Sequence, residues 1–271
     1  MRATILCAVI IASGVTVRGQ DPAWPAFDVV SIKPTASDTR GNSFGSRPGG
    51  RWTMSNRSIG TLIRAAYPTP VNELFGAPEW VTSDPYDVDA RAGESVPAER
   101  ITLMLRRLLA ERFKLRMHYE TRELPVYALV IAGKDGKPGA GLVRSTIDCE
   151  AVRAARQAGR TYEGPMPANG APPCAWTAEY KTNGPVTRFG GLPLSRLSES
   201  LGQPDGRVVV DKTGLTGNYE FTLRYTDQPA PSDDTPSLFT ALQEQLGLRL
   251  VPDRAPLQVV VIDAIERPTE N

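Results

Sequence analysis

The sequence contains only one histidine, His118, and three cysteines among its 271 residues. A single histidine excludes every metal site built from several histidines. It also makes His118 the only base that a Ser–His or Cys–His mechanism could use. The 31 Lys and Arg residues balance 30 Asp and Glu residues and form no basic blocks. This balance gives no electrostatic footprint for nucleic acid or an anionic membrane surface, and we expect no metal, cofactor or nucleic-acid partner.

Long apolar runs are absent after the N-terminus, and the N-terminal run is typical of a secretory signal. Met1-Arg2 is a short basic segment, Ala3 to Val17 is apolar, and Val17-Arg18-Gly19 offers a cleavage site. The apolar run is shorter than the ~20 residues that span a bilayer. We therefore expect a signal peptide over residues 1–19 and an exported protein, periplasmic or extracellular, with no membrane span after signal removal. A retained interfacial anchor is the alternative.

Few cysteines remain once the signal is removed, because Cys7 lies inside it. Cys149 and Cys174 are left, in a compartment where a disulfide persists. Their bridge would close a polar segment rich in proline and glycine and stabilise the fold by about 3 kcal/mol through chain entropy. We expect this disulfide rather than two free thiols.

The periodicity of apolar residues predicts an α+β protein. One helix is clear, because Ile101, Met104, Leu105 and Leu108 recur at helical spacing after Pro97. Other helices are expected over residues 58–67, 194–201 and 236–246. Strands are expected over residues 26–33, 52–55, 85–92, 115–121, 124–132, 207–211, 218–225, 248–251 and 257–265.

This order suggests up to four repeated helix–strand–strand units, with helices packed on mainly antiparallel sheets. Residues 20–145 then form an N-terminal half of two units, and residues 194–271 form a C-terminal half of two units. Residues 146–193, which contain both cysteines, are expected to be a variable loop or linker.

The segment VVVDKTGLTGNYEFTLRY, residues 208–225, contains the Lys-Thr-Gly motif of penicillin-recognising enzymes at Lys212. Those enzymes also need Ser-x-x-Lys and Ser-Asp-Asn, and the sequence contains neither. We therefore interpret the segment as a hairpin with a turn at Thr213 to Gly217, whose glycines provide unusual backbone angles.

A second enzyme-like motif, GNSFG, places Ser43 in the Gly-x-Ser-x-Gly pattern of a nucleophile elbow. That elbow requires a strand before the serine and a helix after it. Polar loop sequence flanks Ser43 on both sides, so we interpret the match as fortuitous. Asp84, Asp87 and Asp89 likewise lack the glycine and closing glutamate of a calcium loop, and we interpret them as exposed acids on a strand.

His118 lies on a predicted strand whose residues alternate between two faces. Met117 and Tyr119 point one way, so Arg116, His118 and Glu120 point the other. We expect a polar strand face on which His118 packs between charged neighbours. The alternative is a polar groove or interface, lined by His118, Glu120, Arg122 and Glu123.

Six ordered segments together resemble one family, a secreted family of unknown function that is expanded in soil acidobacteria. They are FDVVSIKP, PGGRWTMSNRSIGTLIRAAY, GAPEWVTSDPYDVDA, LLAERFKLRMHYETRELPVYALVIA, VVDKTGLTGNYEFTLRY and SLFTALQEQLGLRLVPDRAPLQVVVIDAIERPTEN. The resemblance covers Phe27 to Asn271 and leaves the signal and the region of Cys149 and Cys174 as the variable part. The family also occurs as the extracellular segment of membrane zinc peptidases of the β-lactam-sensor type. The resemblance therefore implies a sensing or binding role, and it carries over no catalytic residues.

Two functions follow from these patterns. The first is an exported, non-enzymatic binding protein for an envelope protein or small ligand, with contact surfaces at Arg116, His118, Glu120 and Arg122 and at Lys212 and Thr213. The second is an exported hydrolase with His118 as base, Glu120 or Glu123 beside it, and Ser43 as a candidate nucleophile. A structural envelope protein is the third possibility.

Overall fold

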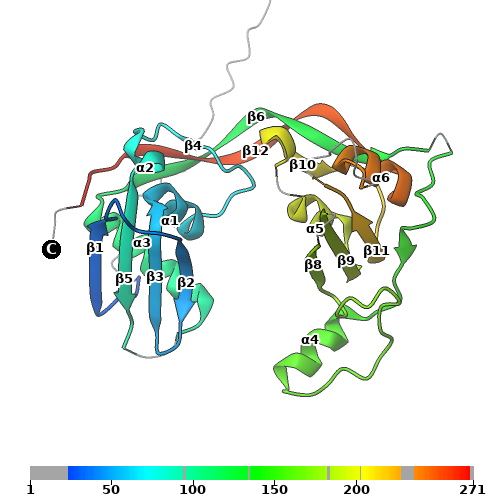
Figure 1. Ribbon diagram of the computed structural model, residues 1–271, viewed down its shortest axis with the longest axis horizontal. Helices are drawn as coiled ribbons and strands as arrows, with labels where there is room; N and C mark the ends of the chain where they lie inside the picture. Colours follow the sequence, from blue (N-terminus) through cyan, green and yellow to red (C-terminus); the bar gives the residue numbers. More distant parts are fainter. Residues whose placement is uncertain are drawn as a thin grey trace, which may run out of the picture. The chain divides into compact units, whose positions relative to one another are not determined.

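The computed structural model describes residues 24–93, 96–133, 135–181, 184–201, 203–226 and 235–268. The expected signal peptide lies outside the described residues. The chain has the α+β architecture expected from its sequence. It divides into two compact units, of which unit 1 combines the described parts of Met1–Arg122 and Pro256–Asn271, and unit 2 is Glu123–Ala255 (Figure 1).

Unit 1 is built on an antiparallel sheet in the order β1-β5-β3-β2. Its strands are β1 (Val29–Pro34), β2 (Ser43–Arg47), β3 (Arg51–Ser58) and β5 (Pro85–Arg91). Helices α1 (Ile59–Ala66) and α3 (Ala98–Arg112) pack on one face of this sheet. The short α2 (Trp80–Ser83) and β4 (Leu74–Phe75) connect these elements.

Alternation along β5 explains why one face of this sheet is buried. Tyr86, Val88 and Ala90 are buried among the helices, while Asp87 and Asp89 between them are only half-buried. The apolar residues of α3 that the sequence identified, from Ile101 to Leu109, are buried against the same core. The buried face of β5, which repeats every two residues, therefore packs in the same core as the buried face of α3, which repeats every 3.6 residues.

Unit 2 has its own antiparallel sheet in the order β7-β11-β9-β8. Its strands are β7 (Val143–Arg144), β8 (Trp176–Lys181), β9 (Gly184–Leu192) and β11 (Tyr219–Arg224). The helices of the unit are α4 (Cys149–Gln157), α5 (Leu194–Ser200), α6 (Leu238–Leu246) and the 3-10 turn η1 (Pro204–Gly206). Phe189, Phe221 and Leu242 lie in a core distinct from that of unit 1.

The sequence predicts two strands over residues 115–132 and two over residues 248–265, each pair joined by a turn. Both predictions are wrong, because each pair is one continuous strand. β6 runs from Arg116 to Ile131, and β12 runs from Leu248 to Ala264. The polar segments TREL and PDRAP were interpreted as turns, but neither contains the Gly or Asn that favours positive φ in tight turns. Both segments stay extended instead, and β6 and β12 are hydrogen-bonded neighbours in a third sheet, in the order β10-β6-β12-β4.

The predicted hairpin over residues 208–225 is also wrong. β10 (Val208–Asp211) pairs in parallel with β6, whereas β11 pairs with β9 and β7 in another sheet. The glycine-containing turn between them does exist, with φ of +70° at Gly214 and +91° at Gly217. It moves the chain from one sheet to another instead of folding a strand back on its neighbour.

The segment 146–193, expected to be a loop or linker, contributes α4, β8 and β9 to unit 2. Asp148 caps α4 by accepting hydrogen bonds from the backbone N–H groups of Glu150 and Ala151. Cys149 and Cys174 lie at disulfide distance, with their Cα atoms 5.5 Å apart, as the sequence predicted. The two units also divide the chain differently from the expected halves, since residues 123–145 belong to unit 2 and the C-terminal strand returns to unit 1.

The last helix begins after Ser237, whose side chain accepts a hydrogen bond from the Thr240 N–H, and not after Thr235 as expected. It ends at Gly247, which has the left-handed conformation that glycine adopts at helix C-termini. Of the helices in the described ranges, none is long and apolar enough to cross a membrane.

Candidate functional site

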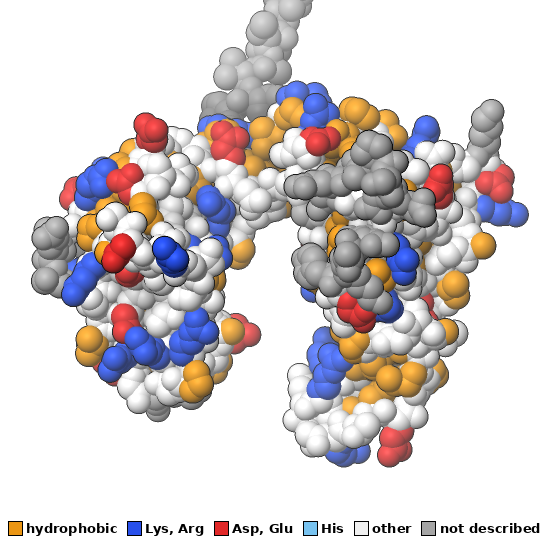
Figure 2. Space-filling view, viewed as in Figure 1, with side chains coloured by type: hydrophobic (Ala, Val, Ile, Leu, Met, Phe, Trp, Pro, Cys, Tyr) orange, Lys and Arg blue, Asp and Glu red, His pale blue; other side chains and the backbone are white. Residues whose placement is uncertain are grey.

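The sheet of unit 1 presents a polar face opposite its helices, and we call it the outer face. Strand registers place its residues in three rows across β1, β5, β3 and β2. The rows are Val29, Arg91, Arg51 and Arg47; Ser31, Asp89, Thr53 and Gly45; and Lys33, Asp87, Ser55 and Ser43. Figure 2 shows Lys and Arg side chains gathered over the ends of β5, β3 and β2 on this face.

A hollow of about 600 Å³ lies on the outer face, and we call it the sheet hollow. This volume is within the range of small-molecule sites, roughly 300–1,000 Å³. Its floor includes Met54 and Val88, and its walls are polar. The wall residues are Ser31, Lys33, Ser43, Arg47, Pro48, Arg51, Thr53, Ser55, Asp87 and Asp89.

One oxygen of the Asp87 carboxylate is saturated by donors of the protein itself. Its Oδ1 accepts hydrogen bonds of 2.9 Å from the hydroxyls of Thr35 and Ser55 and from the backbone N–H of Asn56. Partial burial alone would raise the pKa of Asp87, but the hydrogen bonds from Asn56, Ser55 and Thr35 outweigh it and hold the pKa below its ordinary value. Asp87 is therefore ionised, and its Oδ1 is held by three donors of the sheet and the adjoining chain.

Asp89 is engaged in the same way. Arg51 donates to it from Nε at 2.9 Å and from Nη2 at 2.6 Å, and Arg91 approaches at 3.8 Å. The hydrogen bond from Arg51 lowers the pKa of Asp89, against a smaller opposing effect of burial. Of the two acids of the sheet hollow, Asp89 is thus paired with arginine, whereas Asp87 accepts hydrogen bonds from neutral donors.

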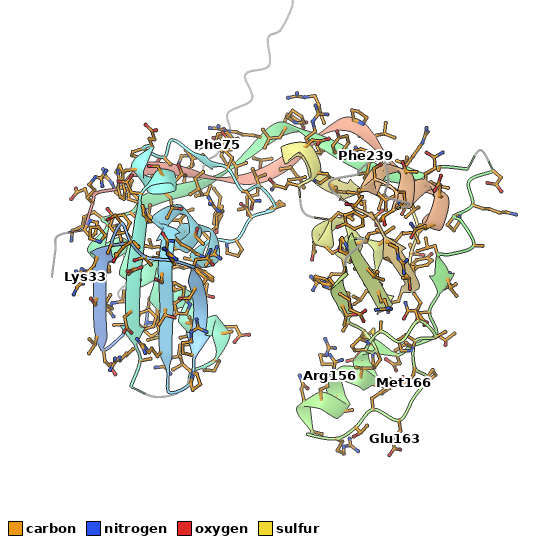
Figure 3. The ribbon with its side chains drawn as sticks, viewed as in Figure 1. Lys33, Phe75, Arg156, Glu163, Met166 and Phe239 are labelled. Atoms are coloured by element: carbon orange, nitrogen blue, oxygen red, sulfur yellow. A yellow bond between two sulfur atoms is a disulfide. The ribbon has the colours of Figure 1, made fainter. Side chains whose placement is uncertain are left out.

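The cations of the outer face are less completely engaged. Arg47 donates from Nε to the Thr53 hydroxyl at 3.2 Å, and its two Nη groups have no acceptor within the described part of the chain. Lys33 extends from the exposed edge of β1 (Figure 3), and among the described residues its ammonium has no ion-pair partner. The ammonium of Lys33 and the Nη groups of Arg47 are therefore available to a ligand in the hollow.

Ser43 lines this hollow from β2. β2 leads into the antiparallel strand β3, not into a helix, so the strand–turn–helix context of a nucleophile elbow is missing. Ser43 lies opposite Ser55, and the lining of the hollow does not include His118.

His118 lies on β6 and contacts Asp263 on β12, with 2.9 Å between Nδ1 and Oδ1. Its side chain is 26% exposed and that of Asp263 is 44% exposed. Glu120, expected beside His118, instead accepts two hydrogen bonds from Arg122, which also stacks on Phe75 at 4.3 Å. The strand therefore alternates as predicted, and its polar side chains are paired within the chain.

Of the other expected contact residues, Lys212 and Thr213 are also engaged. Lys212 forms an ion pair of 2.7 Å with Asp253 on β12. The Thr213 hydroxyl and N–H both donate to Asp211, which fixes the start of the turn. Glu123 accepts a hydrogen bond at its carbonyl from Arg254, and Arg116 is exposed.

Sequence reasoning missed Asp263 and the sheet hollow for one reason. Asp263 is 145 residues from His118, and the rows of the outer face join residues as far apart in sequence as Val29 and Arg91. The only local signal was the alternation of Asp87 and Asp89 on β5. In the ranges that the structure describes, no three His, Cys, Asp or Glu side chains group closely enough to hold a metal ion.

Comparison with known proteins gives one match. A family model described as "Protein of unknown function (DUF3738)" matches residues 60–265. No curated protein and no solved structure matches the chain.

Proposed function

The chain belongs to the DUF3738 family of proteins of unknown function, and we propose that it is an exported, non-enzymatic binding protein whose ligand occupies the sheet hollow. The observation that carries the proposal is the contrast within the hollow, where Asp89 and Oδ1 of Asp87 accept hydrogen bonds from the protein, but the Lys33 ammonium and the Nη groups of Arg47 have no acceptor in the described part of the chain. Buried polar groups normally find partners inside the protein. Polar groups that converge on a hollow without doing so are available to a ligand.

A non-enzymatic role is supported by the chemistry of the hollow. Nucleophilic catalysis requires a base within hydrogen-bond reach of the nucleophile. Ser43 lines the hollow, whereas His118 is engaged with Asp263 on other strands. The proposed binding role also agrees with the resemblance to extracellular segments of sensor-type membrane peptidases, from which we infer a function in envelope sensing.

A thermal-shift screen tests the proposal. The purified exported protein is combined with envelope extracts, cell-wall fragments, β-lactams and small metabolites, since a ligand that binds the folded state raises Tm by mass action. Ser31→Tyr fills the hollow without changing its charge, and we expect it to abolish the shift produced by any ligand found. A ligand that shifts Ser31→Tyr as much as wild type would place the binding site elsewhere, at the β6 face or at Lys212 and Thr213.

A hydrolase remains the second candidate, favoured by one observation. Asp263 contacts His118 at Nδ1, as the acid of a Ser–His–Asp triad contacts its histidine. The carboxylate would then be Asp263 rather than Glu120 or Glu123. Turnover of ester or glycoside substrates that His118→Ala abolishes, with Tm unchanged, would favour this candidate over the binding protein.

A further inference from the structure

We propose that the sheet hollow recognises an anionic small molecule, carrying a carboxylate or a phosphate, through Arg47 and Arg51, which line it beside Arg91 at the end of the same row. The inference rests on the proposed function and specifies its ligand class. The three arginines form a continuous row on neighbouring strands, since Arg91 pairs with Arg51 and Arg51 pairs with Arg47.

A row of like charges disfavours the folded sheet. Side chains directly opposite on antiparallel strands lie about 5 Å apart at Cβ, and like charges in this position are destabilising. Among the described residues, Asp89 is the one carboxylate that forms an ion pair with the row. The arrangement therefore carries excess positive charge at one end of the hollow, and a bound anion would remove the repulsion.

The donor geometry fits an anion with two or more oxygens. Arg51 uses Nε and Nη2 on Asp89, which holds its guanidinium plane in place. Arg47 donates a hydrogen bond from Nε to the Thr53 hydroxyl. This bond orients the Arg47 guanidinium and leaves both of its Nη groups available to a ligand. Planar guanidinium forks of this kind match carboxylate and phosphate oxygens.

The hollow continues from the arginines across the middle row of the outer face to Lys33. Ser31 and Thr53 occupy the middle row, and Gly45 leaves open space there because it has no Cβ. Lys33 lies in the far row beside Asp87. A ligand that contacts the arginines can thus place hydroxyl or amide groups on the middle row, and a second anionic group can reach Lys33.

The volume favours a small molecule over a macromolecular surface. A hollow of about 600 Å³ with polar walls holds a metabolite-sized ligand. The near-balanced charge of the whole chain also gives no broad field for a polyanion.

Isothermal titration calorimetry with inorganic phosphate, citrate and neutral glucose tests the inference on the full exported protein. We expect phosphate or citrate to bind and glucose to bind far more weakly, and the stronger of the two anions identifies the oxygen group. Arg47→Gln should weaken anion binding about tenfold, the size of one lost charge-assisted hydrogen bond. Arg100→Gln, an exposed residue of α3 outside the outer face, is the matched control.

A second readout separates binding from a structural role. Without ligand, Arg47→Gln should leave Tm unchanged or raise it, because it removes a like-charge contact. A lower Tm together with unchanged anion binding would mean that the row is structural and would overturn the inference. So would absence of phosphate and citrate binding at millimolar concentration, or an equal loss in Arg100→Gln.

The two proposals fail in different ways. If a neutral ligand binds and Ser31→Tyr abolishes its binding while Arg47→Gln does not, the hollow is a binding site and only the anion assignment is wrong. If anions bind equally to wild type and to Ser31→Tyr, both proposals are wrong.

Discussion

Asp89 on β5 accepts two hydrogen bonds from the Arg51 guanidinium on the neighbouring strand β3, at 2.9 Å from Nε and 2.6 Å from Nη2. The pair joins the two central strands of the sheet in unit 1 on the face opposite the helices. It therefore links the stability of this sheet to the ionisation of a carboxylate.

Acid should destabilise unit 1 through Asp87 and Asp89. Both carboxyls have a pKa below the ordinary value in the folded chain, so their stabilisation is present above the unfolded pKa of about 3.9 and is lost as pH falls through the folded pKa. We expect the Tm of wild type to fall steeply below about pH 4. Asp87→Asn should lower Tm at neutral pH and flatten this acid dependence.

The matched control is Asp38→Asn, which changes an exposed acid in the loop before β2. It should reproduce the wild-type pH curve of Tm. An equally steep acid dependence in Asp87→Asn would mean that other carboxyls control acid unfolding.

High pH should destabilise unit 1 through ionisation of Tyr67. Burial raises the pKa of Tyr67 to about 12, against a smaller opposing effect of the nearby Arg106. A folded pKa above the unfolded value of about 10 means that the stabilisation is complete below that pH and is lost as pH rises toward about 12. In a phenolate absorbance titration, Tyr67→Phe should remove the step of highest pH, and an unchanged titration curve would contradict the assignment.

Gly247 should tolerate alanine poorly for a steric reason beyond its backbone angle. Its φ is +64°, and an added Cβ would collide with the backbone of Gly139. Gly214 has a similar φ of +70° but open space around it. Gly214→Ala should cost about 1 kcal/mol in urea unfolding, and Gly247→Ala should cost clearly more. Equal costs would show that the contact with Gly139 relaxes freely.

Reduction of the disulfide should affect unit 2 only. The bond joins α4 to the segment before β8, and the loop between its cysteines spans 25 positions. Loss of a bridge of this length costs about 3 kcal/mol by chain entropy. Hydrogen exchange with and without reductant should show faster exchange around α4 and β9, with unit 1 amides unchanged, and Cys174→Ser should reproduce the effect.

The sequence was sufficient where a local pattern determines the structure. The expected helix after Pro97 is α3 to within two residues, because its apolar face repeats at helical spacing. Gly247 ends α6 as predicted, because glycine adopts the left-handed conformation without penalty. The pairing of Cys149 with Cys174 followed from counting the cysteines that remain in the exported chain.

Local patterns gave wrong predictions where pairing with residues far away in the sequence determines whether a segment is a strand or a turn. TREL and PDRAP have the composition of turns, but they remain extended within long strands that are neighbours of each other. β2, with the sequence SFGSR, has few good strand formers and was expected to be loop. β2 contributes Arg47 to the row of arginines and Ser43 to the hollow. Because β2 was not predicted as a strand, the hollow could not be predicted from local sequence patterns.

The return of β12 to unit 1 has a consequence for the order of synthesis. Val260 and Ile262 are buried in the core of unit 1, and the Glu266 N–H donates to the carbonyl of Phe113. The N-terminal residues of this core leave the ribosome long before the strand that completes it. Unit 2 is encoded without interruption and can fold first, whereas the core of unit 1 cannot be completed until the last strand of the chain has been synthesised.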